Sequence, residues 1–307
     1  MDEFHGIANV NGVIRPTEDA HVPVLDRGFL YGDSIYEVFR TYDGIPLFFE
    51  EHWARFQNSA ALIHMDIGLS KQQLVDEIRE TIKASGAADV RQDVYVRYIV
   101  TRGEGALDLY PHPDLTTNYV IIVREVPAWN PDFYTHGLSI AIVRTRRNPG
   151  DALDPNIKGG NYLNNVLGVI EARALGANDC LMLSDSGLIT ESSNSNVFFV
   201  IGGKLLTPSQ TAANLRGLTK AAVHDACQAR GLLSEESEIS VADLAAATEC
   251  FVTSATREVM PVKSLRIDAL TECSFPEGGG DITRKVREYY REFMRDYVAA
   301  HAELSMF

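Results

Sequence analysis

One lysine and one glutamate differ from the other charged residues of this chain because small polar residues surround both. Lys158 lies just before a segment with helical spacing, and Glu191 lies where the chain leaves an apolar strand predicted over residues 180–183. A lysine amine forms a Schiff base with an aldehyde. Once displaced, the amine can move a proton if burial or nearby positive charge lowers its pKa. Taken alone, such residues are more often a solvated loop lysine and a turn glutamate, because short motifs match by chance.

The segments around these two residues favour a catalytic role over that of a loop lysine and a turn glutamate. They read Asn156-Ile157-Lys158-Gly159-Gly160-Asn161-Tyr162 and Thr190-Glu191-Ser192-Ser193-Asn194-Ser195-Asn196. Together they resemble the class IV pyridoxal-phosphate aminotransferases, which include branched-chain aminotransferases, D-amino acid aminotransferases and aminodeoxychorismate lyases. In that family the lysine carries the cofactor as a Schiff base, and the glutamate pairs with its pyridine nitrogen so that the ring acts as an electron sink. The resemblance places Lys158 and Glu191 on these positions and covers nearly the whole chain.

Further motifs occur in the family's order. Arg55 matches the phosphate-binding arginine of the family, although alone it would pass for a helical surface residue. Residues 216–219 match a turn that opens a helix, where backbone N–H groups of Leu218 and Thr219 suit a phosphate; a simple N-cap is the alternative. Thr256, in a Ser/Thr-rich turn, fits a second phosphate hydroxyl, and Tyr162 resembles the tyrosine beside the cofactor ring. The resemblance therefore implies pyridoxal 5′-phosphate as cofactor.

The signals for substrate are mixed. The branched-chain pattern is matched by Tyr31, Arg40, Tyr95 and Arg97. In that group, the resemblance implies, Tyr95 helps to bind the α-carboxylate and Arg97 meets the side-chain carboxylate of glutamate. Tyr36 and Val38 are more similar to the D-amino acid group. The short spacing between Lys158 and Asn161 resembles that of D-amino acid aminotransferases and of other branched-chain-like members. The D-group's Arg-x-His motif is absent, and Tyr110-Pro111-His112 stands in its place. We also expect Ala255 and Thr256 to contact the substrate.

Composition narrows the class of protein. The chain has 307 residues, 45% of them hydrophobic, and a formal net charge of −14. Such an acidic balance argues against nucleic acid as a main partner, but a local arginine cluster can still bind an anionic substrate. No apolar run is long enough to span a membrane. The first residues, Met1 to His5, show no basic region followed by an apolar one, so we expect no signal peptide.

The cysteines and histidines give no metal motif. Cys180, Cys227, Cys250 and Cys273 are far apart, with no Cys-x-x-Cys, and the histidines form no His-Glu-x-x-His. Two of the cysteines fall in apolar strands, which suits buried free thiols and, together with the missing signal peptide, a cytoplasmic protein. Gly103-Glu104-Gly105 lacks a third glycine and is a poor dinucleotide motif. We expect no metal site.

The order of predicted elements indicates an α/β protein with two domains. We expect a small α+β domain over residues 1–126, a linker over 127–132 and a larger α/β cofactor-binding domain over 133–307. Strands are expected over residues 34–42, 93–101 and 118–126, and helices over 49–65, 161–176, 218–230 and 281–300. In the helix over 161–176, Leu163, Val166, Leu167 and Ile170 recur at helical spacing and form an apolar stripe. We attach no function to residues 272–280.

The resemblance implies a transaminase that moves an amino group between a branched-chain L-amino acid and 2-oxoglutarate. It implies a homodimer whose partner subunit lends Tyr31 and the loop over residues 107–112. A D-amino acid or (R)-amine transaminase, a lyase that releases pyruvate from aminodeoxychorismate, and a protein that binds the cofactor without catalysis remain alternatives. No role for nucleic acid or a membrane is expected.

Overall fold

The computed structural model describes residues 4–307, and the chain divides into two compact units. The first unit comprises residues 1–127, Ile157–Asn161 and Asp296–Phe307, and the second comprises Ala128–Asn156 and Tyr162–Arg295. Relative to the predicted division, the structure moves the lysine segment and the last residues to the first unit. Of the residues behind the signal-peptide expectation, Met1 to Glu3 lie outside the described part of the chain.

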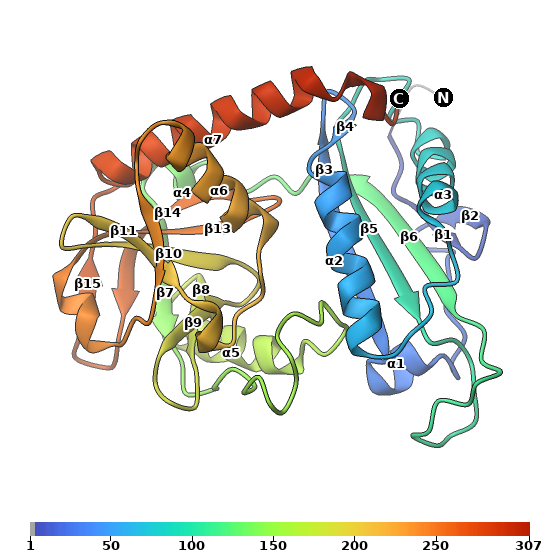
Figure 1. Cartoon of the computed structure of the whole chain (residues 1–307), viewed down its shortest axis with the longest axis horizontal. Coiled ribbons are helices and arrows are strands. Elements are labelled where there is room, and N and C mark those ends of the chain that lie inside the picture. Colours follow the sequence, from blue (N-terminus) through green and yellow to red (C-terminus); the bar gives the residue numbers. More distant parts are fainter. Residues whose placement is uncertain (1–3) are drawn as a thin grey trace. The chain divides into compact units, whose positions relative to one another are not determined.

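The described part of the first unit is built on a six-stranded sheet in which neighbouring strands are antiparallel (Figure 1). The strand order is β2-β1-β6-β5-β3-β4. The strands are β1 (Ile7–Val10), β2 (Val13–Pro16), β3 (Ser34–Tyr42), β4 (Ile45–Pro46), β5 (Val94–Thr101) and β6 (Asn118–Glu125). The nine-residue strand β3 carries the side chains on which the site depends.

Helices cover one face of this sheet. α2 (Phe49–Leu62) packs along β3, and α3 (Lys71–Ala84) lies against β1 and β6 (Figure 1). Ser70 begins α3 with a reciprocal capping box with Gln73, which satisfies N–H groups that a helix start leaves open. The core between sheet and helices includes Ile35, Phe39, Phe56, Leu74, Ile78, Ile82 and Val96. The unit also has the short α1 (Arg27–Tyr31) and a 3₁₀ helix, η3 (Ala302–Leu304).

The second unit is built on a mixed sheet of nine strands among the residues described. The order is β12-β11-β10-β13-β14-β7-β8-β9, and β15 pairs with β14. The strands are β7 (Leu138–Ile142), β8 (Asp179–Leu183), β9 (Ile189–Ser192), β10 (Asn196–Ile201), β11 (Lys204–Pro208), β12 (Ser234–Ser237), β13 (Ala247–Ser254), β14 (Glu258–Arg266) and β15 (Glu272–Ser274). The buried side chains of this core include Leu181, Val197, Phe199, Val252 and Met260.

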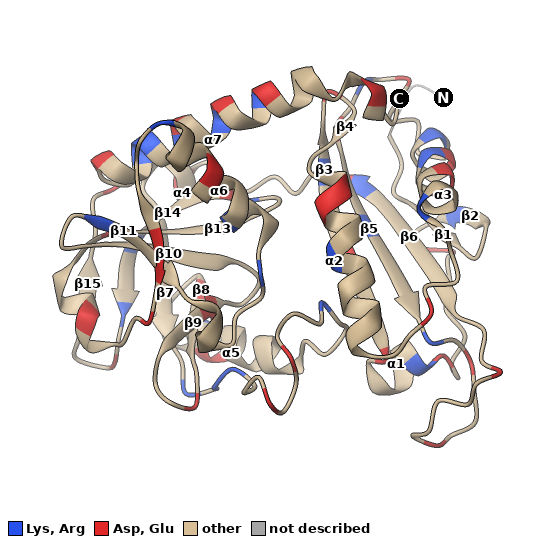
Figure 2. Ribbon diagram, in the orientation of Figure 1, with Lys and Arg blue, Asp and Glu red and all other residues tan. Residues whose placement is uncertain are grey.

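Four α-helices and two 3₁₀ helices accompany this sheet in the described chain. They are α4 (Asp132–Thr135), α5 (Leu163–Ala174), η1 (Gln210–Ala212), α6 (Leu218–Ala229), η2 (Ala242–Ala246) and α7 (Asp281–Ala300). The residues of α7 from Asp296 onward are counted with the first unit. Along α7, basic and acidic residues alternate (Figure 2), as expected of a largely solvated helix. None of the helices in residues 4–307 is both long and apolar enough to cross a membrane.

The apolar stripe of α5 is not its buried face. Leu163, Val166, Leu167 and Ile170 are exposed, with exposed fractions between 46% and 71%. The buried positions are instead Asn165, Gly168 and Ala172. A side chain at Gly168 would begin 3.0 Å from the sulfur of Cys180 in β8, so α5 packs closely on the sheet through its small residues. The apolar periodicity of α5 therefore marks an outward face.

Candidate active site

Lys158 lies at the edge of the first unit's sheet, where backbone hydrogen bonds fix it on two sides. The N–H of Tyr36 in β3 donates to the carbonyl of Lys158 over 2.9 Å. The N–H of Lys158 donates to Oγ of Ser59 in α2 over 3.1 Å. Gly160 also bonds to the carbonyl of Ser34 (3.1 Å), and a side chain there would begin 2.5 Å from Oγ of Ser34. The glycines after Lys158 thus permit this close approach to β3.

The side chain of Lys158 meets Tyr36. Its Nζ lies 3.4 Å from the Tyr36 hydroxyl and 4.6 Å from the ring centroid. The guanidinium of Arg97 lies 3.8 Å from the centroid of the same ring. In the register of β3 and β5, Val38 stands opposite Arg97 and Arg40 opposite Tyr95, so these side chains share one face of the sheet. Five of the residues predicted for substrate therefore lie on two adjacent strands, and one of them, Tyr36, contacts Lys158.

Tyr31 belongs to the same unit and ends α1. The Arg27 guanidinium lies 5.0 Å from the Tyr31 ring and donates to the carbonyls of Asp108 (2.8 Å) and Leu109 (2.9 Å). Arg27 is 3% exposed, whereas Leu107, Leu109 and Tyr110 are at least 63% exposed. A single buried arginine thus ties Tyr31 to the loop over residues 107–112.

Arg55 is not the surface arginine that its helical position permits. Its Nε and Nη2 lie 2.6 and 2.7 Å from the two carboxylate oxygens of Glu37, and Nδ1 of His52 lies 2.7 Å from Oε2 of Glu37. Burial opposes ionisation of Glu37, but the charge and hydrogen bonds of Arg55 and the hydrogen bond of His52 hold its pKa well below its usual range. Burial lowers the pKa of His52, which keeps the imidazole neutral near pH 7.

In the second unit, Glu191 on β9 is buried between a cation and a backbone donor. Its Oε1 lies 2.9 Å from Nη2 of Arg147, and its Oε2 accepts the N–H of Leu215 over 3.2 Å. Arg147 also donates to Oδ1 of Asn165 over 3.2 Å. These contacts hold the carboxylate in one orientation.

The N-terminus of α6 comes just after Leu215, the residue whose N–H bonds to Glu191. Gly217 is its N-cap and provides no side-chain cap, and the first turn, which the structure describes in full, has no acidic residue. Asn196 in β10 donates to the carbonyl of Leu215 over 3.0 Å, and a side chain at Gly217 would overlap Oδ1 of Asn196. Leu218 and Thr219 thus begin a helix whose first N–H groups and positive dipole end suit an anion.

The turn between β13 and β14 holds Ala255 and Thr256, both half-buried. Arg257 anchors this turn from within: it donates to Oγ of Ser195 (2.8 Å) and pairs with Asp179 (2.9 Å). In the described part of the chain, the buried Oγ1 of Thr253 has no hydrogen-bond partner. Tyr162 is the N-cap residue of α5 and is half-buried. The second unit therefore presents a rigid carboxylate, an open helix start and a hydroxyl-rich turn.

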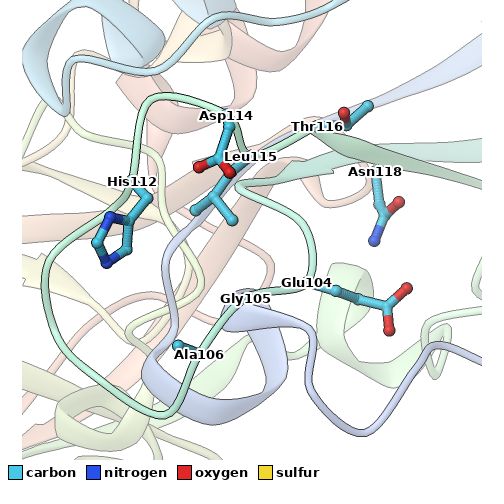
Figure 3. Close-up of a pocket in the computed structure, with 8 residues that line it drawn as sticks. All are labelled: Glu104, Gly105, Ala106, His112, Asp114, Leu115, Thr116 and Asn118. Carbon is cyan, nitrogen blue, oxygen red and sulfur yellow. The ribbon is translucent and has the colours of Figure 1, made fainter.

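A cavity of about 500 Å³ lies elsewhere, under the loop after β5 (Figure 3). Its lining includes Glu104, His112, Asp114 and Asn118. His112 ends the loop predicted to be lent to a partner subunit, and no other predicted site residue lines the cavity. Among the described residues, no group of three or more His, Cys, Asp or Glu side chains is placed to hold a metal ion. We assign no role to this cavity.

Comparison with known proteins identifies the family. The profile of the family described as Amino-transferase class IV matches residues 34–265. The chain belongs to the class IV aminotransferases. It is 33% identical to a putative branched-chain-amino-acid aminotransferase of Methanocaldococcus jannaschii over 92% of this chain and 94% of that one. It is 31% identical to the D-alanine aminotransferase of Bacillus licheniformis, over 83% of this chain and 87% of that one.

A solved structure agrees in fold. The branched-chain amino acid aminotransferase of Thermobaculum terrenum, in its PLP-bound holo-form, is 26% identical and superposes with a TM-score of 0.79 over 96% of this chain and 96% of that one. The predicted family, fold and enzyme class are confirmed.

The aminotransferase depends on pyridoxal 5′-phosphate, as predicted. The residues present fit that group, because each unit offers matching chemistry on its own. The first unit has an amine, Lys158, on a rigid backbone. The second has a carboxylate, Glu191, together with the open start of α6 and the Thr253 hydroxyl, which lacks a partner within residues 4–307. An amine, a carboxylate and N–H donors are what the aldehyde, pyridine nitrogen and phosphate of the cofactor require.

Sequence reasoning missed Glu37, His52 and Arg147. Glu37 had a signal: it is a charge on the face of β3 that otherwise carries Ile35 and Phe39. Arg147 had none, because it lies in a loop among other arginines.

Proposed function

We propose that this aminotransferase moves an amino group between a branched-chain L-amino acid and 2-oxoglutarate. The observation that carries the proposal is the pairing of Arg97 with Val38 across β3 and β5, beside the Tyr36 ring. Burying the apolar side chain of a donor against Val38 and the Tyr36 ring contributes about 25 cal/mol of binding free energy per Å² of apolar surface. A γ-carboxylate needs a fixed cation at the same place, because an unpaired buried charge is costly. Arg97 supplies that cation.

The mechanism assigns one task to each residue. Pyridoxal 5′-phosphate, when bound, supplies the aldehyde that accepts the amine and a ring that withdraws electrons from the substrate Cα. Lys158 holds the cofactor through Nζ and, once the donor amine displaces it, takes the proton from Cα. The hydroxyl of Tyr36, 3.4 Å from Nζ, orients the amine. Tyr95 and Arg40 bind the α-carboxylate side of the substrate.

The remaining residues hold the cofactor. Glu191, held by Arg147, would pair with the pyridine nitrogen, and Tyr162 would lie beside the ring. We assign the phosphate to Arg55, to the N–H groups of Leu218 and Thr219, and to Thr256. Ala255 in the same turn lies on the substrate side. Charge-assisted hydrogen bonds of this kind are worth roughly 1.5–3 kcal/mol each.

A D-amino acid transaminase is the second candidate. Tyr36 and Val38 favour it, and the D-alanine aminotransferase relative is nearly as similar as the branched-chain one. Bulk at Val38 narrows the pocket wall opposite Arg97, which disfavours the largest donors. The two candidates share Lys158 and Glu191 and differ only in the substrate they accept.

We propose a cytoplasmic homodimer as the working form. The outward apolar face of α5 and the exposed Leu107, Leu109 and Tyr110 support it, because contiguous exposed apolar side chains mark interaction surfaces. In this proposal the partner subunit provides Tyr31 and the loop over residues 107–112. Sedimentation equilibrium at micromolar concentration tests it, and a monomer would contradict it.

A donor panel tests the substrate assignment. The purified holoenzyme is assayed with L- and D-amino acids and both enantiomers of an aryl amine, with 2-oxoglutarate as acceptor. We expect L-leucine, L-isoleucine or L-valine to have the highest kcat/KM. D-alanine or an (R)-aryl amine ahead of L-leucine would overturn the branched-chain assignment and support the second candidate.

A further inference from the structure

Glu37 is a charged residue in a place where an apolar one would be expected. It lies on the face of β3 that packs against α2 and is 0% exposed, between Ile35 and Phe39, which are equally buried. Removing a carboxylate from water costs several kcal/mol unless it is paired and hydrogen-bonded. A buried ion pair is often no more stabilising than apolar residues of the same volume. The position therefore calls for a role beyond stability.

The contacts of Glu37 fix one guanidinium. Both carboxylate oxygens accept from Arg55, at 2.6 and 2.7 Å, so the plane and direction of that guanidinium are set. His52 braces Oε2 from the previous turn of α2 at 2.7 Å. Tyr98 stands opposite Glu37 in β5; burial and the Glu37 charge raise its pKa, so it stays neutral. The ionised groups of this cluster are thus one carboxylate and one guanidinium.

The same elements hold Lys158. Ser59, one turn after Arg55 on α2, donates to the Arg55 carbonyl over 3.0 Å and accepts the N–H of Lys158. Tyr36, the residue before Glu37, bonds to Lys158 through its backbone and its hydroxyl. The Glu37–Arg55 bond therefore joins α2 to β3 at the point where both hold Lys158.

We propose that Glu37 is a positioning residue that aims Arg55 at the cofactor phosphate in register with Lys158. The inference rests on the proposed assignment of Arg55 to that phosphate. Glu37 acts here through geometry and against its own charge, because a carboxylate beside Arg55 weakens the attraction of an anion. Geometry and charge therefore predict opposite effects of removing it. If position dominates, loss of Glu37 weakens phosphate binding; if charge dominates, loss of Glu37 strengthens it.

The test compares two ligands that differ in the phosphate. The full chain, freed of cofactor, is titrated with pyridoxal 5′-phosphate and with pyridoxal, and the ratio of the two Kd values measures the phosphate contribution without any assay of turnover. Glu37→Gln keeps the shape but removes one acceptor for Arg55. Glu37→Asp keeps the charge but shortens the side chain by one methylene, which moves the carboxylate away from Arg55. We expect both to lower the preference for the phosphorylated ligand by about tenfold or more.

Two controls separate the possible failures. Glu249→Gln alters another buried carboxylate, which accepts from Ile282 and Thr283 at the start of α7 and has no place in the site, so the ratio should not change. Arg55→Lys tests the assignment on which the inference rests, and it should lower the ratio by itself. An unchanged ratio in Arg55→Lys overturns that assignment and the inference with it.

Three results bear on Glu37 alone. A lower ratio in both Glu37 variants supports the inference, and Glu37→Asp serves by itself where Glu37→Gln does not fold. An unchanged or higher ratio in the Glu37 variants, with Arg55→Lys lowered, overturns the positioning role and leaves the Arg55 assignment intact. A fall of equal size in Glu249→Gln also overturns it, because the effect would then follow general loss of packing.

Discussion

The amine of Lys158 lies 3.4 Å from the hydroxyl of Tyr36, and the Tyr36 ring also carries the guanidinium of Arg97 at 3.8 Å from its centroid. One buried aromatic side chain thus contacts both the proposed catalytic amine and the proposed substrate cation. Its backbone N–H bonds to Lys158 as well. Because Tyr36 contacts both residues, we expect a substitution that moves Arg97 to alter the position of the Lys158 amine as well.

Tyr36→Phe removes the hydroxyl and keeps the ring. We expect kcat to fall by roughly tenfold, equivalent to about 1.4 kcal/mol in barrier, because Lys158 loses an orienting partner during proton transfer. The stacked Arg97 should stay in place, so KM for 2-oxoglutarate should change little. Steady-state kinetics on both half-reactions provides the check. An unchanged kcat with a raised KM would assign Tyr36 to binding instead.

Glu191→Gln should retain the cofactor but weaken the electron sink, because an amide does not keep the pyridine nitrogen protonated. We expect kcat to fall by two or more decades, about 3 kcal/mol or more in barrier. The side chain is isosteric, so the hydrogen bond from Leu215 should persist. A loss below tenfold would mean that Glu191 is not the partner of the pyridine nitrogen.

Much of the fold follows from the sequence because local signals are strong there. β3 begins and ends where predicted, since Asp33 and the Asp43-Gly44 turn bound an alternating run. The extent of α7 was also predicted correctly. The buried face of α5 could not be read from the sequence, because its packing depends on Gly168 and Ala172, which carry no hydrophobic signal, while its apolar residues face outward.

Only those residues of the candidate site that lie in family motifs or on alternating strand faces could be predicted from the sequence. Lys158 and Glu191 stand in recognisable segments, and the faces of β3 and β5 follow from alternation. The partners that orient these residues are set by tertiary contacts between distant segments. Glu37 meets α2, and Arg147 meets β9, across separations that no local pattern encodes.

Arg97→Leu tests the dual substrate pocket. We expect glutamate and 2-oxoglutarate to lose far more kcat/KM than leucine and its keto acid, because only the former bring a second carboxylate. Val38→Gly, opposite Arg97, is the matched change on the same face and should favour bulkier donors without selecting against glutamate. Equal losses for leucine and glutamate in Arg97→Leu would assign Arg97 to the α-carboxylate.

The pH dependence of stability should report on His52. Burial lowers its pKa in the folded chain, so below its unfolded pKa of about 6.5 the unfolded state takes up a proton that the folded state does not. Stability should therefore fall as the pH drops below about 6.5, by roughly 1.4 kcal/mol per pH unit at most for one histidine. His52→Gln should flatten this part of the curve in urea unfolding between pH 7 and 5.5. Parallel curves for the two proteins would show that His52 does not titrate on unfolding.

Covalent mapping of the cofactor shows which lysine carries it. Sodium borohydride reduces the bond between the cofactor and the amine that carries it, and mass spectrometry of the digested chain then locates the added pyridoxyl group. We predict the group on Lys158, with no addition and no transamination in Lys158→Ala, whose thermal stability without cofactor should match that of the unchanged chain. A pyridoxyl group on another lysine, or normal turnover by Lys158→Ala, would contradict the account.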